Sequence, residues 1–221
     1  MLTSCGVTPE KVHVVYNARD PADSDVLRDR ARQFREELPG AGSAPVVGAV
    51  SSARPEKGMQ VLVEAAPRIL ERCPDARFVL VGAGTERFEP RLRELGLRDR
   101  FWLPGHRSDA VALMTLFDVF VLPSIDMESC PNVLLEAMDV GLPVVGSDVG
   151  GVAEIVEEGR TGLVVPPGDP QALANAVVAV LGRDDRGRAW GETGRQTVRE
   201  RFSPDRKCRE TLRVYERLLG D

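Results

Sequence analysis

The chain has 221 residues, 43% of them hydrophobic, and a formal net charge of −5 with acidic and basic residues interspersed. This composition fits a folded globule with a sizeable core and argues against a disordered chain. It offers no basic stripe for a nucleic-acid backbone, and no apolar run approaches the roughly 20 residues that a membrane-spanning helix needs.

Short runs rich in β-branched residues alternate with helical patterns along the chain. The runs predict strands at residues 12–16, 46–50, 78–81, 101–103, 119–122, 144–145 and 163–165. The other patterns predict helices at residues 25–37, 59–72, 88–95, 110–116, 131–140, 152–157, 171–181, 188–201 and 204–219. This alternation predicts an α/β fold with a doubly wound parallel sheet, whose ligands bind beyond the carboxyl ends of the strands.

Two cations follow the predicted strand 46–50. Arg54 and Lys57 lie in the turn before the helix 59–72. A guanidinium offers a planar fork of donors and an ammonium a compact charge, so the two side chains could face a diphosphate. The spacing alone is a weak pattern, because a solvated turn before a helix looks the same.

A pair of glycines follows the next predicted strand, 78–81. Gly82 and Gly84 flank Ala83, and glycine lets a ligand approach the backbone closely. An ordinary turn from a strand to a helix would have the same composition. We therefore treat Gly82 and Gly84 as candidate ligand-binding residues whose interpretation depends on the motifs that follow.

Two glutamates stand eight positions apart across the start of the predicted helix 131–140. Glu136 is a carboxylate in an otherwise apolar helix, and Glu128 precedes it. The helix start, at Asn132 and Val133, offers unpaired amides to a phosphate, and Glu136 lies roughly 7 Å further along the axis. That separation matches the distance from a nucleotide's diphosphate to its ribose. Taken alone, the pair favours a simpler interpretation, in which Glu128 caps the helix and Glu136 forms a salt bridge.

Metal, disulfide and histidine chemistry have little support. The two histidines, His13 and His106, have no companion at metal-ligand spacing, so we expect no metal. Four widely spaced cysteines favour reduced thiols: Cys5, Cys73, Cys130 and Cys208. Together with the lack of a signal sequence at the start, they predict a cytoplasmic location.

Three further motifs follow the glutamate pair in order: Glu136-Ala137-Met138, Gly141-Leu142-Pro143-Val144 and Gly150-Gly151. With Lys57-Gly58 before them, they make the chain resemble the carboxyl-terminal, donor-binding half of retaining glycosyltransferases of the large family 4 type, which have the GT-B architecture. The resemblance implies a Rossmann-like domain over residues 11–202, a linker-like segment at 1–10 and a C-terminal helix at 203–221.

The resemblance also implies a reaction: metal-independent transfer of a hexose, with retention, from a UDP- or GDP-linked sugar to a hydroxyl acceptor. In it Arg54 and Lys57 hold the phosphates, Glu128 orients the sugar and Glu136 anchors the ribose, and no cofactor other than the donor substrate is needed. Backbone atoms near residues 101–105 tend to contact the base in this family, which leaves UDP and GDP unseparated.

The family normally has an amino-terminal acceptor-binding domain, and this sequence begins at what resembles the linker. We therefore expect a missing domain or a partner subunit. Two alternatives stay open: a nucleotide-sugar-binding subunit of a split enzyme, with no activity of its own, and a GT-B nucleotide-sugar epimerase.

Overall fold

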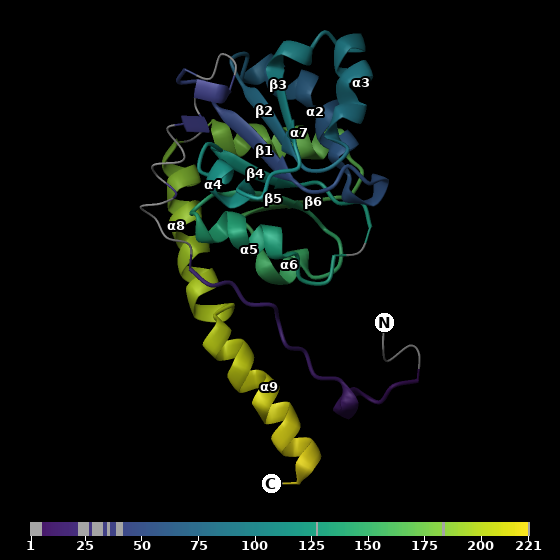
Figure 1. Cartoon of the computed structure of the whole chain (residues 1–221), viewed down its shortest axis with the longest axis vertical. Coiled ribbons are helices and arrows are strands. Elements are labelled where there is room, and N and C mark those ends of the chain that lie inside the picture. The colour runs from purple at the N-terminus through teal and green to yellow at the C-terminus, as the bar shows by residue number, and fades with distance from the viewer. Residues whose placement is uncertain are drawn as a thin grey trace.

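A six-stranded parallel sheet forms the centre of the molecule, in the order β3-β2-β1-β4-β5-β6 (Figure 1). This computed structural model describes residues 6–21, 27, 33–34, 36–38, 42–126, 128–182 and 184–220. The strands are β1 Val46–Val50, β2 Arg77–Val81, β3 Phe101–Gly105, β4 Val119–Leu122, β5 Val144–Ser147 and β6 Gly162–Val165. The predicted doubly wound α/β fold is confirmed.

The helices follow the strands in alternation. They are α2 Met59–Arg72, α3 Glu89–Glu94, α4 Ala110–Met114, α5 Asn132–Asp139, α6 Val152–Ile155, α7 Pro170–Leu181, α8 Asp184–Arg201 and α9 Pro204–Leu219. Short 3-10 helices are η2 Pro9–Lys11, η3 Pro55–Lys57, η4 Thr85–Phe88 and η5 Arg98–Arg100. The predicted helix 25–37 lies largely outside the described residues.

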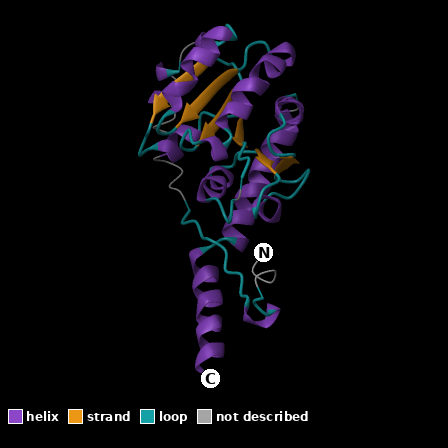
Figure 2. Ribbon diagram, turned by 90° about the vertical axis from the view of Figure 1, so that its right-hand side faces the viewer, coloured by secondary structure: helices purple, strands orange, loops and turns teal. Residues whose placement is uncertain are grey.

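Helices cover both faces of the sheet, so the strands are buried on both sides (Figure 2). On one face Val47 packs in a cluster with Leu62 of α2 and Val177 of α7. On the other, Phe120 packs in a cluster with Leu134 of α5. Because side chains alternate along a strand, a strand buried on both faces must be apolar throughout, which explains the continuous valine-rich runs in the sequence.

Two sequence expectations need correction. Residues 12–16 are not a strand: they form an extended segment outside the sheet that lines a pocket with α9, and Val14 is 67% exposed. The β-branched composition favours extended backbone, but in the part of the chain that the structure describes this segment pairs with none of the six strands. Pro131 is the N-cap of α5, with φ −69° and ψ 113°, so the first helical residue is Asn132.

The last helix, α9, projects away from the body of the molecule (Figure 1). None of its residues is buried, and its apolar stripe is exposed at Leu212, Tyr215, Leu218 and Leu219. Among the described residues, no helix combines the length and the apolar character that crossing a membrane requires.

Candidate functional site

The candidate site lies where the strand order reverses. The chain passes from β1 outward to β2 and β3, and then returns to β4 on the other side of β1. The loops after β1 and β4 therefore meet at the carboxyl edge of the sheet, which is where ligands bind in open α/β sheets. The two loops are joined directly, because Ile125 N donates to Glu56 O at 2.9 Å.

This junction brings Lys57 and Glu128 together. Lys57 Nζ donates to Glu128 Oε1 at 2.7 Å, and Ser124 Oγ donates to the same oxygen at 2.7 Å. Glu128 is 8% exposed and Ser124 is fully buried. A buried carboxylate needs such partners, since an unpaired charge away from water is costly. Both contacts fall on Oε1, which fixes the orientation of the carboxylate.

The backbone of Glu128 is held from the other side by the loop after β5. Gly151 N donates to Glu128 O at 2.7 Å. Gly150 has φ +53°, and a Cβ added there would lie 1.9 Å from the same carbonyl oxygen. Only glycine permits this approach. The Gly151 amide is thus engaged by the protein, which argues against its use as a phosphate donor.

Helix α5 begins directly after this loop. Its first internal hydrogen bond runs from Leu134 N to Pro131 O at 3.0 Å, so the amides of Asn132 and Val133 precede the hydrogen-bonded turns. Asn132 is exposed and Val133 is partly exposed. These are the amides that a helix start offers to an anion.

Glu136 lies in the second turn of α5, and its ion pair is formed with Arg19 rather than with Lys57. Its Oε1 is 3.8 Å from Arg19 Nη1, and its side chain is 25% exposed. Burial raises the pKa of this carboxyl above its ordinary value, and the nearby Arg19 charge opposes that effect. Arg19 Nε also lies 3.7 Å from Asp139 Oδ2, one turn further along α5.

Arg54 stands apart from these groups. Its side chain is 65% exposed, with Nε 3.2 Å from Glu56 Oε1 and 3.2 Å from Ser52 Oγ. Arg54 lies in the same loop as Lys57, but its side-chain contacts are on the exposed surface.

The glycines after β2 bring a third loop to the same edge. Gly82 has φ +146°, and a Cβ there would lie 1.7 Å from Ser51 O in the loop after β1. Ala53 N donates to Ala83 O at 2.9 Å, which ties the two loops together. Gly84 is the left-handed N-cap of η4. Loop packing alone therefore explains why glycine occupies both positions, whether or not a ligand binds there.

Sequence reasoning missed two groups. Ser124 carries no motif, and only its place after β4 could have drawn attention to it. Arg19 is 117 positions from Glu136, and no local pattern marks that contact. Asn17 lies in the same segment as Arg19 and helps to fix it, because its Nδ2 donates to Cys130 O at 2.9 Å. His106, expected to have little functional weight, is exposed.

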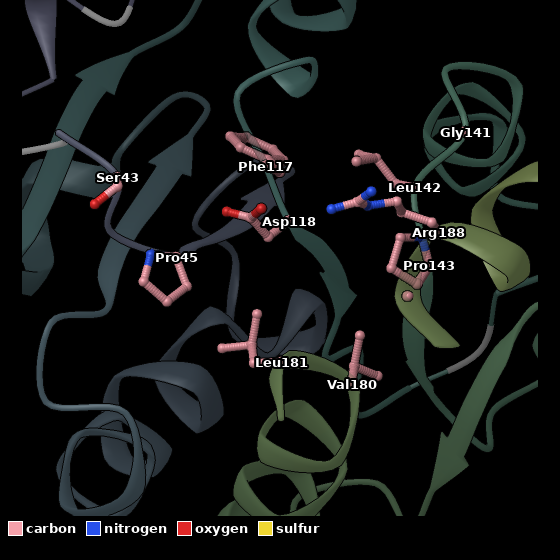
Figure 3. A pocket seen from close by; sticks show the side chains of 11 residues that line it. Ser43, Pro45, Phe117, Asp118, Gly141, Leu142, Pro143, Val180, Leu181 and Arg188 are labelled. Atoms are coloured by element: carbon pink, nitrogen blue, oxygen red, sulfur yellow. The ribbon is translucent and has the colours of Figure 1, made fainter. Parts of the chain in front are cut away.

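A separate pocket of about 290 Å³ lies at the opposite, amino edge of the sheet (Figure 3). It is lined in part by Phe117, Asp118 and Pro143, which precede β4 and β5, and by Arg188 of α8. Gly141, Leu142 and Pro143 of the Gly141-Leu142-Pro143-Val144 motif line it, but none of the candidate ligand-binding residues does. Ligands of such sheets bind at the other edge. Within the described ranges, no three His, Cys, Asp or Glu side chains gather as metal ligands.

Comparison with known proteins places the fold and these loops in a family. The chain is 37% identical over 164 residues to a phosphatidyl-myo-inositol mannosyltransferase of Mycobacterium leprae, covering 73% of this chain and 43% of that protein. It superposes on the crystal structure of Anabaena Alr3699/HepE in complex with UDP with a TM-score of 0.85 and 26% identity, covering 99% of this chain and 60% of that one.

A third comparison concerns the fold alone. The crystal structure of the C-terminal domain of a glycosyl transferase group 1 family protein, LpcC of Francisella tularensis, matches with a TM-score of 0.70 and 22% identity. The match covers 87% of this chain and 99% of that domain. By contrast, the chain spans about half the length of the mannosyltransferase. Residues 44–183 match the family described as glycosyl transferases group 1, and the chain belongs to that family.

Proposed function

We propose that this chain is the donor-binding half of a retaining glycosyltransferase, which moves a hexose from a nucleotide diphosphate sugar to a hydroxyl acceptor. The observation that carries the proposal is the Lys57–Glu128 pair, at the reversal of the strand order and directly before the start of α5. A cation paired with a fixed carboxylate thus lies at the carboxyl edge, in the loops that lead to a helix start.

The diphosphate would lie between Lys57 and the amides of Asn132 and Val133. Charge grows on the leaving diphosphate in the transition state, and donors already fixed in place stabilise that charge without reorganising. Lys57 is held by Glu128, so its position does not depend on the ligand. Arg54, exposed at the rim, would add a second cation over the phosphates.

The two glutamates would contact the two ends of the donor. Lys57 and Ser124 both bind Oε1 of Glu128, so Oε2 is the oxygen we assign to the sugar hydroxyls. Glu136, about four residues further into α5 at 1.5 Å per residue, would accept from the ribose hydroxyls. The complex of Alr3699/HepE with UDP supports a uridine nucleotide as the first ligand to test.

For the chemical step we propose a front-face displacement. The acceptor oxygen bonds to the anomeric carbon on the face from which the diphosphate departs, and the acceptor's proton passes to the departing phosphate oxygen. This route retains the anomeric configuration and needs no protein nucleophile. Its support is the resemblance of the motif order to retaining enzymes of this family.

An amino-terminal acceptor-binding domain or a partner subunit would complete the enzyme. The chain covers 43% of the mannosyltransferase, and the apolar stripe of α9 is exposed. We propose that this stripe packs against the acceptor-binding unit. If that unit is a separate chain, this one is the nucleotide-sugar-binding subunit of a split enzyme.

Calorimetry with UDP and with GDP in EDTA tests donor binding. We expect binding without added metal, because Lys57 and the α5 start already supply positive potential. Lys57→Ala should weaken binding, whereas Lys11→Ala, which removes an exposed lysine in η2, should not. Binding that appears only with magnesium or manganese would contradict the proposed role of the cationic side chains.

A further inference from the structure

Arg19 is fixed by a segment that leads toward β1. The ring of Tyr16 packs edge-on against Phe202, with centroids 5.6 Å apart, and its hydroxyl donates to Glu154 of α6. Asn17 Nδ2 donates to the carbonyl of Cys130, and Arg19 N donates to Phe202 O at 2.8 Å. These contacts anchor residues 16–19 to three parts of the fold.

The anchored segment points the Arg19 guanidinium at two carboxylates on one face of α5. Nη1 is 3.8 Å from Glu136 Oε1, and Nε is 3.7 Å from Asp139 Oδ2. Residues three apart on a helix are neighbours, so the two acids lie on the same face of α5. Among the described residues, buried Arg19 Nε has no hydrogen-bond partner, so its interaction with Asp139 is one of charge.

These distances place the Arg19 charge beside both carboxylates, which are partly or fully buried. The Asp139 side chain is 1% exposed and that of Glu136 is 25% exposed. Burial raises the pKa of Glu136, and the Arg19 charge lowers it. From α8, Arg195 donates to the main-chain carbonyls of Asp139 and Val140. On α6, Glu154 accepts from Tyr16.

We propose that Arg19 is a positioning residue for the nucleotide site, holding the carboxylate of Glu136 in a ligand-accepting arrangement from outside the sheet. The proposal rests on donor binding at this site, and adds a residue that no motif contains. An ionised Glu136 accepts from both hydroxyls of a ribose, whereas a protonated one uses an oxygen as a donor. Removing the Arg19 charge leaves the partly buried Glu136 without this cation, and burial disfavours the charged form.

The first test needs no nucleotide. The side-chain carboxyl of Glu136 is titrated by carbon-detected NMR in the wild type, Arg19→Gln and Arg19→Lys, with Glu136→Gln to assign the signal. Arg19→Gln should move the midpoint upward, and Arg19→Lys, which keeps the charge, should restore most of the wild-type value. Arg93→Gln, which removes an exposed arginine paired with Glu89 on α3, is the matched control. An unchanged midpoint in Arg19→Gln overturns the proposal.

The second test measures nucleotide affinity at about pH 6 and about pH 8. In Arg19→Gln the affinity should fall by roughly tenfold more than in the wild type on going to the lower pH, as expected for a carboxyl that has lost an adjacent cation. Arg19→Lys, which keeps the charge, should show a pH dependence close to that of the wild type. If the wild type binds nucleotide and Arg19→Gln shows the same pH profile, the role of Arg19 is refuted and the donor assignment stands. A wild type that binds no nucleotide refutes the donor assignment, and the NMR midpoint still decides the electrostatic part.

Discussion

At the scale of single residues, the site divides into two pairs of charges with different surroundings. Lys57 and Glu128 share a short hydrogen bond at a buried junction of loops, with side chains 23% and 10% exposed. Arg19 meets Glu136 at 3.8 Å, too far for a hydrogen bond. The first pair is a hydrogen-bonded ion pair, whereas the second interacts through charge alone. Substitutions in the two pairs should therefore have different effects.

The first prediction separates the roles of three site residues. Lys57→Ala and Glu136→Ala should each lose about 1.5–3 kcal/mol of affinity for free nucleotide, the usual range for hydrogen bonds to charged groups. Glu128→Ala should weaken binding of the nucleotide sugar more than binding of the free nucleotide, because it loses a contact with the sugar as well as the partner that holds Lys57. Calorimetry with UDP and UDP-glucose, and with GDP and GDP-mannose, measures both. Equal weakening of the two ligands by Glu128→Ala would remove this division of roles.

The second prediction follows from the burial of Glu136. Burial raises the pKa of this carboxyl above 4.5, and the opposing effect of Arg19 is smaller. A carboxyl with a raised pKa binds its proton more tightly in the folded state, so it stabilises the fold below its ordinary pKa. That contribution is lost as the pH rises through the folded value.

Glu136→Gln cannot ionise and keeps that contribution at every pH. The variant should match the wild type in stability below pH 4.5 and exceed it at about pH 8, while binding nucleotide less well. Urea unfolding at the two pH values measures the difference. A variant less stable than the wild type at about pH 8 would mean that the ionised carboxylate, paired with Arg19, stabilises the fold.

At the scale of elements, the carboxyl edge is built by loops that touch backbone to backbone. Gly82, Gly58 and Gly150 each face a carbonyl oxygen of another loop at a distance that no Cβ tolerates. Such contacts lock the loops after β1, β2, β4 and β5 into one surface. The glycines that the sequence offers as ligand contacts are therefore also part of the scaffold that fixes Glu128 and Lys57.

The third prediction isolates this packing from backbone strain. Gly82→Ala should destabilise the fold by about 3 kcal/mol, because the added carbon meets Ser51 O at 1.7 Å on top of a positive φ. Gly96→Ala is the matched control: its φ is +69°, and a Cβ there meets nothing within 4 Å. It should cost only about 1 kcal/mol, from the left-handed backbone alone. Equal losses for the two variants, measured by urea unfolding, would show that the contact with Ser51 relaxes without cost.

The sequence predicted the strands and helices better than the contacts between them. Every predicted strand from residue 46 onward is confirmed, because valine-rich runs between turns are what a doubly covered sheet requires. The run at 12–16 failed, since β-branched residues favour extended backbone whether or not a neighbouring strand exists. The direct ion pair of Lys57 with Glu128 was not predicted either. It depends on β4 returning beside β1, and strand order is not written in any local pattern.

At the scale of the whole molecule, the candidate site faces one side only. Lys57, Glu128 and the start of α5 lie at the carboxyl edge of a single sheet, and the described residues form no second sheet. Residues 12–15 and α9 lie outside that body, with Val14 and the apolar stripe of α9 exposed. Both features fit a molecule that works against a second unit.

The fourth prediction is that the chain alone binds donor but does not transfer sugar at a useful rate. Transfer needs an acceptor held within near-attack distance in a cleft from which water is excluded. Such orientation accounts for roughly 7–11 kcal/mol of a barrier, a share that a one-sided site should not supply.

The chain is incubated with labelled UDP-glucose, UDP-N-acetylglucosamine and GDP-mannose and with mixed hydroxyl acceptors, alone and with a candidate acceptor-binding polypeptide. Leu212→Ser and Tyr215→Ser on α9 should abolish stimulation by that polypeptide while leaving nucleotide affinity unchanged, since neither residue contacts the candidate site. Robust transfer by the purified chain alone would show that it is a complete enzyme and that no second unit is required.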